Sequence, residues 1–94
     1  MALQFNLREF GTAFATRERG AEMRHAVLAR IADERAVVLD FSAIENVSYS
    51  FADEFVGKLA AEREDLDVQV IHMVDSVAGI ISTARERRAS AVAC

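Results

Sequence analysis

The sequence predicts a small, single-domain α/β fold with a three- or four-stranded, mostly parallel sheet and about three helices. Three observations support this. Segments with the periodicity of strands alternate with segments of helical periodicity, which implies right-handed crossovers onto a parallel sheet. Of the 94 residues, 52% are hydrophobic, which suits one compact core. The chain has no proline, no low-complexity stretch and no internal repeat, so we expect one domain over residues 1–94.

The N-terminal segment predicts a strand. Its apolar residues alternate with polar ones, a period of two that is typical of a half-exposed strand; they are Leu3, Phe5 and Leu7. Residues 8–15 are ambiguous. Gly11 could support a turn, and Thr12 to Ala15 could form a short second strand or simply a loop.

A helix is predicted after Thr16, which is suited to be its N-cap. The apolar residues of its buried face are spaced by four and are Met23, Val27 and Ile31. The segment from Ala36 to Phe41 is then a nearly unbroken apolar run. Such a run predicts a strand that is buried on both faces at the centre of the sheet.

A second helix is predicted after a connection at residues 42–49. Its buried face recurs at intervals of four and consists of Phe51, Phe55 and Leu59. Gly57 lies inside this helix, where glycine costs roughly 1 kcal/mol relative to alanine. Its presence suggests close packing against a neighbouring backbone.

The last elements are a strand from Val68 to Met73 and a helix capped by Asp75 or Ser76. The buried stripe of this helix is Val77, Ile80, Ile81 and Ala84. Its final turn is expected to hold Arg85, Arg87 and Arg88, where cations complement the negative end of the helix dipole. We expect the chain to fray over residues 89–94.

Composition excludes several classes of function. The net charge of -4 points away from non-specific nucleic-acid binding. No apolar run approaches the roughly 20 residues of a membrane span, and no signal peptide is visible. Two histidines and the single Cys94 give no zinc-ligand spacing, so we expect no metal or cofactor. A lone thiol fits a reducing compartment, and we expect a cytoplasmic protein without membrane contact.

The segment from Val47 to Glu54 carries most of the functional information. Ser50 stands three residues before Asp53, ahead of an apolar helical face, so it could act as a purely structural cap. The same hydroxyl would lie beside unpaired N–H groups that favour a phosphate, and phosphorylation there would change what can dock. The two carboxylates in the first turn would repel that phosphate. Arg17 could pair with one of them or remain solvated.

Two runs of this sequence resemble the signature of the STAS-like family of bacterial proteins. The first is Val37-Val38-Leu39-Asp40-Phe41, and the second is Val47-Ser48-Tyr49-Ser50-Phe51-Ala52-Asp53-Glu54-Phe55-Val56-Gly57-Lys58-Leu59. They match a hydrophobic strand ending in Asp, then Ser-Phe, an acidic pair, and Gly-x-Leu one turn later. The Thr16-Arg17-x-x-Gly20 stretch is also similar, and the resemblance spans roughly Thr16 to Arg88.

This family is a distant relative of the anti-sigma-factor antagonists. In those proteins the equivalent loop reads Asp-Ser-Ser/Thr-Gly, and a partner kinase phosphorylates its second hydroxyl residue. The resemblance places Ser50 at the phosphorylated position. Ser48 and Phe51 stand where the antagonists have Asp and Gly.

The motifs of common enzymes are missing from the sequence. It has no phosphate-cradling glycine loop and no Gly-x-Ser-x-Gly elbow. A triad of Ser50, His72 and Asp40 can be imagined, since all lie near predicted strand ends, but nothing in their spacing selects it. A domain of 94 residues also offers little cleft, so we expect no catalytic residues.

We therefore expect a regulatory module that binds a protein partner, either a kinase-like ATPase or an anti-sigma factor. The residues expected to bind it are Arg17, Asn46, Ser48, Tyr49, Ser50, Asp53 and Glu54. The alternative is a constitutive scaffold or homo-oligomer without phosphorylation. In that case the first strand, at an edge of the sheet, could pair with its copy in a homodimer.

Overall fold

Three parallel strands form the sheet, in the order β1-β2-β3. The computed structural model describes residues 2–11 and 13–93, and side chains up to residue 90. The strands are β1 (Ala2–Asn6), β2 (Ala36–Asp40) and β3 (Asp67–Ile71). Their register aligns Phe5 with Leu39 and Leu39 with Val70. The predicted α/β class with a small parallel sheet is confirmed.

The helices alternate with these strands along the chain. They are the short 3-10 helix η1 (Leu7–Phe10), then α1 (Arg17–Arg30), α2 (Tyr49–Ala52), the π-helical segment η2 (Asp53–Gly57), α3 (Lys58–Glu62) and α4 (Asp75–Ala93). Since α2, η2 and α3 follow one another without a break, we call residues 49–62 the central helix. In the described part of the chain, no helix is both long enough and apolar enough to cross a membrane.

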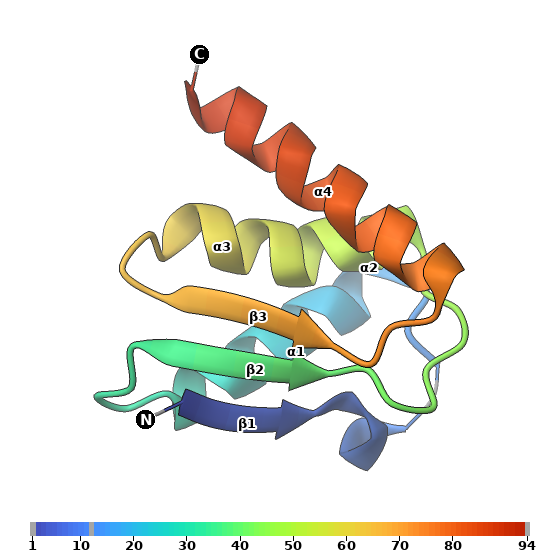
Figure 1. The fold of residues 1–94 in the computed structure, drawn as a ribbon, viewed down its shortest axis with the longest axis horizontal. Coiled ribbons are helices and arrows are strands. Elements are labelled where there is room, and N and C mark those ends of the chain that lie inside the picture. The colour runs from blue at the N-terminus through green and yellow to red at the C-terminus, as the bar shows by residue number, and fades with distance from the viewer. Residues whose placement is uncertain (1, 12, 94) are drawn as a thin grey trace.

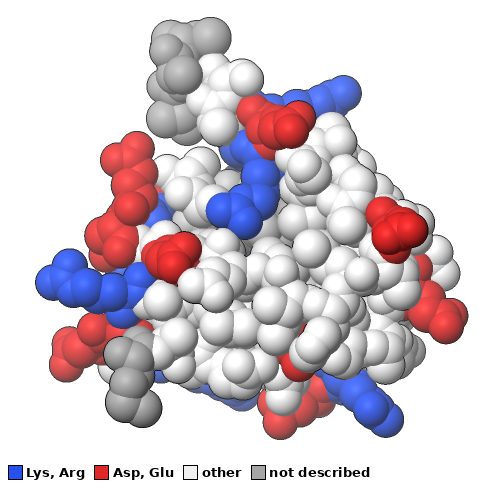
Figure 2. Space-filling view, in the orientation of Figure 1, with Lys and Arg blue, Asp and Glu red and all other residues white. Residues whose placement is uncertain are grey.

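The helices leave one face of the sheet uncovered. Because each strand lies beside its predecessor and crossovers are right-handed, α1 and the central helix fall on the same side of the sheet. Figure 1 shows α1 behind the three strands. On the open face, Val38 is only half-buried, with Gln4 and Gln69 exposed beside it. The prediction that β2 is buried on both faces was therefore wrong. Figure 2 shows this side of the molecule, with its charged side chains mainly around the rim.

The central helix is the core of the protein rather than a cover for the sheet. All seven residues from Phe51 to Gly57 are buried, because α1 packs on one side of this segment and α4 on another. A row of aromatic rings continues the core into the sheet. Ring centroids are 5.2 Å apart for Phe14 and Phe51, 5.6 Å for Phe51 and Phe55, and 6.2 Å for Phe55 and Phe5.

The N-terminal connection differs from the sequence-based expectation in detail. β1 ends at Asn6, and Leu7 is buried in η1 rather than in the strand. Among residues 13–15 the structure has no strand, which leaves the loop as the correct alternative there; Thr12 lies outside the described residues. As predicted, the side-chain oxygen of Thr16 caps α1 by accepting a hydrogen bond from the Arg19 backbone N–H at 3.1 Å.

The last helix is longer than predicted. α4 continues to Ala93, past residue 89, where fraying was expected, and Cys94 lies outside the described residues. The arginines are therefore inside the helix and not in its final turn. They reach across to other elements instead: Arg85 donates to the Val68 carbonyl at 3.1 Å, and Arg88 binds the central helix. The prediction placed them in the final turn because it ended the helix too early.

Two glycines permit the close approach of the helices. A Cβ atom on Gly20 of α1 would lie 2.7 Å from the Phe51 carbonyl oxygen and 2.9 Å from the Glu54 Cβ. A Cβ on Gly57 would lie 3.1 Å from the Arg88 Cγ and 3.4 Å from the Ala84 carbonyl oxygen, so the predicted close packing of Gly57 against a neighbouring backbone is confirmed. By contrast, a Cβ on Gly79 of α4 would meet nothing within 4 Å.

Gly20 and Gly79 therefore form a matched pair of helical glycines. We expect Gly20→Ala to lower the free energy of unfolding by about 2 kcal/mol or more, because the new methyl group forces α1 away from the central helix. Gly79→Ala should raise it by about 0.5–1 kcal/mol through helix propensity alone. Urea denaturation followed by circular dichroism measures both changes. Equal stability of Gly20→Ala and the wild type would contradict the close approach.

Candidate functional site

The central helix follows the connection that leaves the carboxyl end of β2. Ser48 is its N-cap: the Ser48 hydroxyl oxygen accepts a hydrogen bond from the Phe51 backbone N–H at 3.0 Å. The Ser48 backbone N–H in turn donates to the Phe14 carbonyl at 3.3 Å, which ties this entry to the segment before α1. From the sequence, Ser50 was the candidate for this structural cap. The helix begins one residue before Ser50, at Tyr49, so Ser50 lies inside the first turn.

Several of the predicted partner-binding residues meet at this entry. Asn46 is exposed, while Ser48, Tyr49 and Ser50 are half-buried. From α4, the Arg87 guanidinium lies over the Tyr49 ring, 5.2 Å from its centroid. We call the surface formed by Arg17, Asn46, Ser48, Tyr49, Ser50 and Arg87 the α2 entry surface.

Asp53 lies one turn further along the helix, between α1 and α4. Arg88 binds it as a fork, with Nε 2.6 Å from Oδ1 and Nη2 2.8 Å from Oδ2. Arg17 approaches from the other side, with Nη1 2.9 Å from Oδ2. Hydrogen bonds from Arg88 and then Arg17 outweigh the cost of burial and lower the pKa of Asp53 to about 2.

Glu54 joins the same helix to α1. Its Oε2 lies 3.0 Å from both the Arg24 Nη2 and the Lys58 Nζ, and its Oε1 lies 3.0 Å from the Arg17 Nη1. Arg24 also donates through Nε to the Glu54 backbone carbonyl at 3.0 Å. Burial opposes ionisation, but the bonds from Lys58, Arg17 and Arg24 still hold the pKa of Glu54 below its ordinary value.

The acidic pair is thus part of the core and not of the surface. Asp53 is 7% exposed and Glu54 6% exposed, which does not fit the expectation that they face a partner. The predicted pairing of Arg17 is confirmed, since it binds both carboxylates. Four cations pair with these two carboxylates, which weakens the repulsion that they would exert on a phosphate; they are Arg17, Arg24, Lys58 and Arg88.

Three of these cations were not predicted from the sequence to pair with the acidic residues. Lys58 follows Glu54 by four residues, a helical spacing that could have revealed the pair. Arg24 and Arg88 lie 30 and 35 residues from their partners, and no local pattern connects them.

Asp40 and His72 of the triad considered above do lie close together, but the serine beside them is Ser42 and not Ser50. The His72 Nδ1 and the Ser42 hydroxyl lie 3.0 Å and 2.6 Å from the same oxygen of Asp40. Ser42 is also 3.1 Å from the His72 Nδ1. Since serine and aspartate share one imidazole nitrogen, this is not the relay of a nucleophilic triad, in which they bind opposite nitrogens. In the described residues, no three His, Cys, Asp or Glu side chains converge as ligands for a metal.

The assignment of the cap can be tested with two neighbouring serines. Ser48→Ala should lower the free energy of unfolding by about 1 kcal/mol, because the Phe51 N–H loses its acceptor. Ser50→Ala should change it by less than about 0.5 kcal/mol. Denaturant unfolding of both variants measures the difference. A larger decrease in the free energy of unfolding for Ser50→Ala than for Ser48→Ala would show that Ser50 is the cap.

The contribution of Asp53 should depend on pH. Because its pKa in the folded state lies below the ordinary value, its stabilisation is present above about pH 4 and is lost as the pH falls through about 2. We expect Asp53→Asn to lower the free energy of unfolding by about 2 kcal/mol at neutral pH and by much less near pH 2. Unfolding curves across this range measure the effect.

Asp65→Asn is the matched control for this experiment, because Asp65 forms an exposed pair with Arg63. It should cost less than about 0.5 kcal/mol. A loss for Asp53→Asn that stays constant from neutral to acidic pH would show that the carboxylate charge is not what stabilises the helices.

Comparison with known proteins agrees with this architecture. The family model described as a STAS-like domain of unknown function matches residues 19–77, which run from α1 to the start of α4 and include the whole central helix. Searches of the curated proteins and of the solved structures give no match. The match covers more than half of the chain, and the protein therefore belongs to the family of STAS-like domains.

Proposed function

We propose that this STAS-like domain is a non-enzymatic regulatory module that binds a protein partner through the α2 entry surface. The partner we favour is a kinase-like ATPase or an anti-sigma factor in the cytoplasm, because the segment around Ser50 resembles the phosphorylated loop of the anti-sigma-factor antagonists. Phosphorylation of Ser50 by such an ATPase is the proposed switch.

The observation that carries this proposal is that arginine side chains contact residues near Ser50, whereas the neighbouring carboxylates are buried. The guanidinium of Arg17 binds Asp53, three residues after Ser50, and that of Arg87 lies on Tyr49, the residue before it. Arg17 and Arg87 therefore contact residues that lie within three positions of Ser50 in the sequence. The neighbouring carboxylates are buried and already paired. This environment suits a phosphate on Ser50.

Arg17 is the residue through which a phosphate would act. Phosphoserine carries nearly two negative charges and would compete with Asp53 for the Arg17 guanidinium. The Arg17 side chain is 49% exposed and can move, whereas Arg88 would keep its two bonds to Asp53. The switch would thus change the surface charge and the position of Arg17 without unpairing the buried carboxylate. A partner that reads the unmodified surface would then be released.

The proposal is tested with the full chain immobilised as wild type, Ser50→Asp and Ser90→Asp, each exposed to a cell extract with ATP. Ser90 is exposed near the end of α4, so its substitution adds the same charge elsewhere. We expect a protein that binds the wild type and Ser90→Asp but is retained at least about tenfold less by Ser50→Asp. Phosphate incorporation, measured by mass spectrometry, should be lost in Ser50→Ala and kept in Ser48→Ala.

Equal retention by Ser50→Asp and the wild type would contradict the switch. Light scattering of the same variants then tests the alternative, a constitutive homo-oligomer. Among the residues that the structure describes, β1 has β2 as its single neighbour in the sheet, so its outer backbone edge is available for strand pairing. A concentration-dependent dimer that Ser50→Asp leaves unchanged would favour that alternative, and a monomer at all concentrations would count against it.

A further inference from the structure

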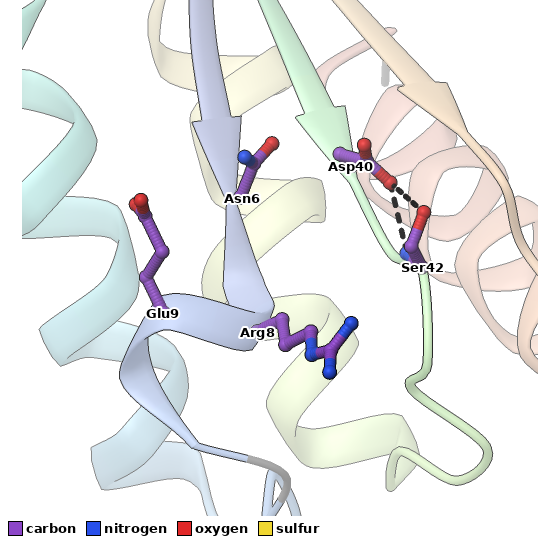
Figure 3. Close-up of a pocket in the computed structure, with 5 residues that line it drawn as sticks. All are labelled: Asn6, Arg8, Glu9, Asp40 and Ser42. Carbon is purple, nitrogen blue, oxygen red and sulfur yellow. Dashed lines mark hydrogen bonds between the residues drawn. The ribbon is translucent and has the colours of Figure 1, made fainter.

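A second polar site lies at the carboxyl edge of β1 and β2. A depression of about 410 Å³ opens there, lined by Asn6, Arg8, Glu9, Asp40 and Ser42 (Figure 3). Asn6 and Asp40 are register partners at the last position of their strands, and Arg8 comes from η1. The carboxyl ends of parallel strands are where open α/β sheets bind ligands.

Asp40 is fixed in place by one of its two carboxylate oxygens. Its Oδ1 accepts hydrogen bonds from the Ser42 backbone N–H at 2.9 Å and from the Ser42 hydroxyl at 2.6 Å, and His72 lies 3.0 Å away. The Ser42 bonds hold the pKa of Asp40 below its ordinary value, so the group stays charged. No hydrogen bond from a described residue reaches Oδ2, which leaves this oxygen as a free acceptor.

The backbone around Asp40 is strained in two places. Ala43 has φ 67° in the turn that the Ile44 N–H closes on the Phe41 carbonyl, and His72 has φ 60° where the chain leaves β3. Residues other than glycine rarely adopt such angles, and they are often found at binding sites. The two turns that contain these residues place the Ser42 and His72 side chains against the Asp40 carboxylate.

Arg8 supplies the opposite charge across the depression. Its side chain is exposed and, within the described part of the chain, forms no hydrogen bond or ion pair. Figure 3 shows its guanidinium extending toward the Ser42 side of the depression, whereas the Glu9 side chain lines it on the side away from Asp40 and Ser42. The Asn6 amide oxygen accepts a bond from the Gln4 side chain, so the Asn6 NH₂ group remains as a second donor beside Arg8.

We propose that this depression binds a small zwitterion that carries a carboxylate and an amine, the class of the amino acids. The carboxylate binds the Arg8 guanidinium and the Asn6 amide, and the ammonium group donates to the Asp40 Oδ2. Guanidinium and carboxylate form charge-assisted, paired hydrogen bonds, which gives the anionic end its orientation. The depression has the volume of a small-molecule site, and each charged end of the ligand meets an opposite charge.

A series of amino acids of increasing length tests this proposal and measures the separation of the two subsites. Glycine, β-alanine, 4-aminobutyrate and 5-aminovalerate are titrated into ¹⁵N-labelled full-length chain, and amide shifts are followed by NMR. Butyrate and butylamine are the controls, since each retains one charged end of 4-aminobutyrate. We expect saturable shifts around Asn6 and Ser42 for at least one amino acid, with affinity about tenfold above that for the singly charged controls.

Arg8→Gln should weaken this binding about tenfold or more, because the carboxylate loses its cation. Arg35→Gln is the matched control: it removes the same charge from an exposed side chain that precedes β2, at the opposite edge of the sheet. Asp40→Asn should abolish selection for the amine. Since Asp40 also holds the Ser42 turn, Arg8→Gln decides the outcome if the whole spectrum of Asp40→Asn changes.

Three results would overturn the proposal. They are the absence of saturable shifts for every amino acid up to about 20 mM, equal affinity for butyrate and 4-aminobutyrate, and an affinity that Arg8→Gln leaves unchanged. Binding at this site is independent of Ser50, so Ser50→Asp should not alter it. The proposed ligand site and the proposed switch can therefore fail separately.

Discussion

The buried pairing of Asp53 and Glu54 with cations from the elements around them is the interaction on which this fold depends. A carboxylate inside a core is unfavourable unless opposite charges and hydrogen bonds compensate its lost hydration. Arg17 and Arg24 supply that compensation from α1, and Arg88 from α4. The position of each neighbouring helix is therefore tied to the same two residues of the central helix.

The ion pairs depend on the close approach of the helices at the two glycines. Arginine side chains can reach these carboxylates from α1 and α4 because the backbones approach closely at Gly20 and Gly57. The π-helical segment contains both acidic residues and Gly57, so the irregular turn coincides with the most crowded part of the core. π-helical turns inside α-helices are frequently found at functional sites. Here that turn links the structural centre to the surface around Ser50.

The buried acidic residues and the arginine that pairs with them therefore have different roles. Asp53 and Glu54 are held in the core, and Arg17 connects them to the surface on which we propose that a partner docks. The carboxyl edge of β1 and β2 is organised differently, around the single carboxylate of Asp40 and two left-handed residues. The uncovered face of the sheet lies between the edge strands β1 and β3 and carries few charges near its centre (Figure 2).

Much of the fold follows from periodicity. Alternating strand and helix patterns determine the order of the elements, because burial of an apolar face at each period is a local property of the chain. The Thr16 cap is likewise local, and Gly57 marks close packing because glycine is costly inside a helix. The pairing of Arg17 with the acidic residues was within reach once their elements were placed at one edge of the sheet.

Other features required the tertiary structure. The apolar run of β2 does not reveal that one sheet face is open, since that depends on which side of the sheet the helices occupy. The choice of Ser48 over Ser50 as cap depends on where packing lets the helix begin. The sequence by itself determined which segments are helices and strands and where the polar clusters fall. Only the tertiary structure decided that Arg88, 35 residues from Asp53, would be its closest partner, because long-range ion pairs have no periodic signal.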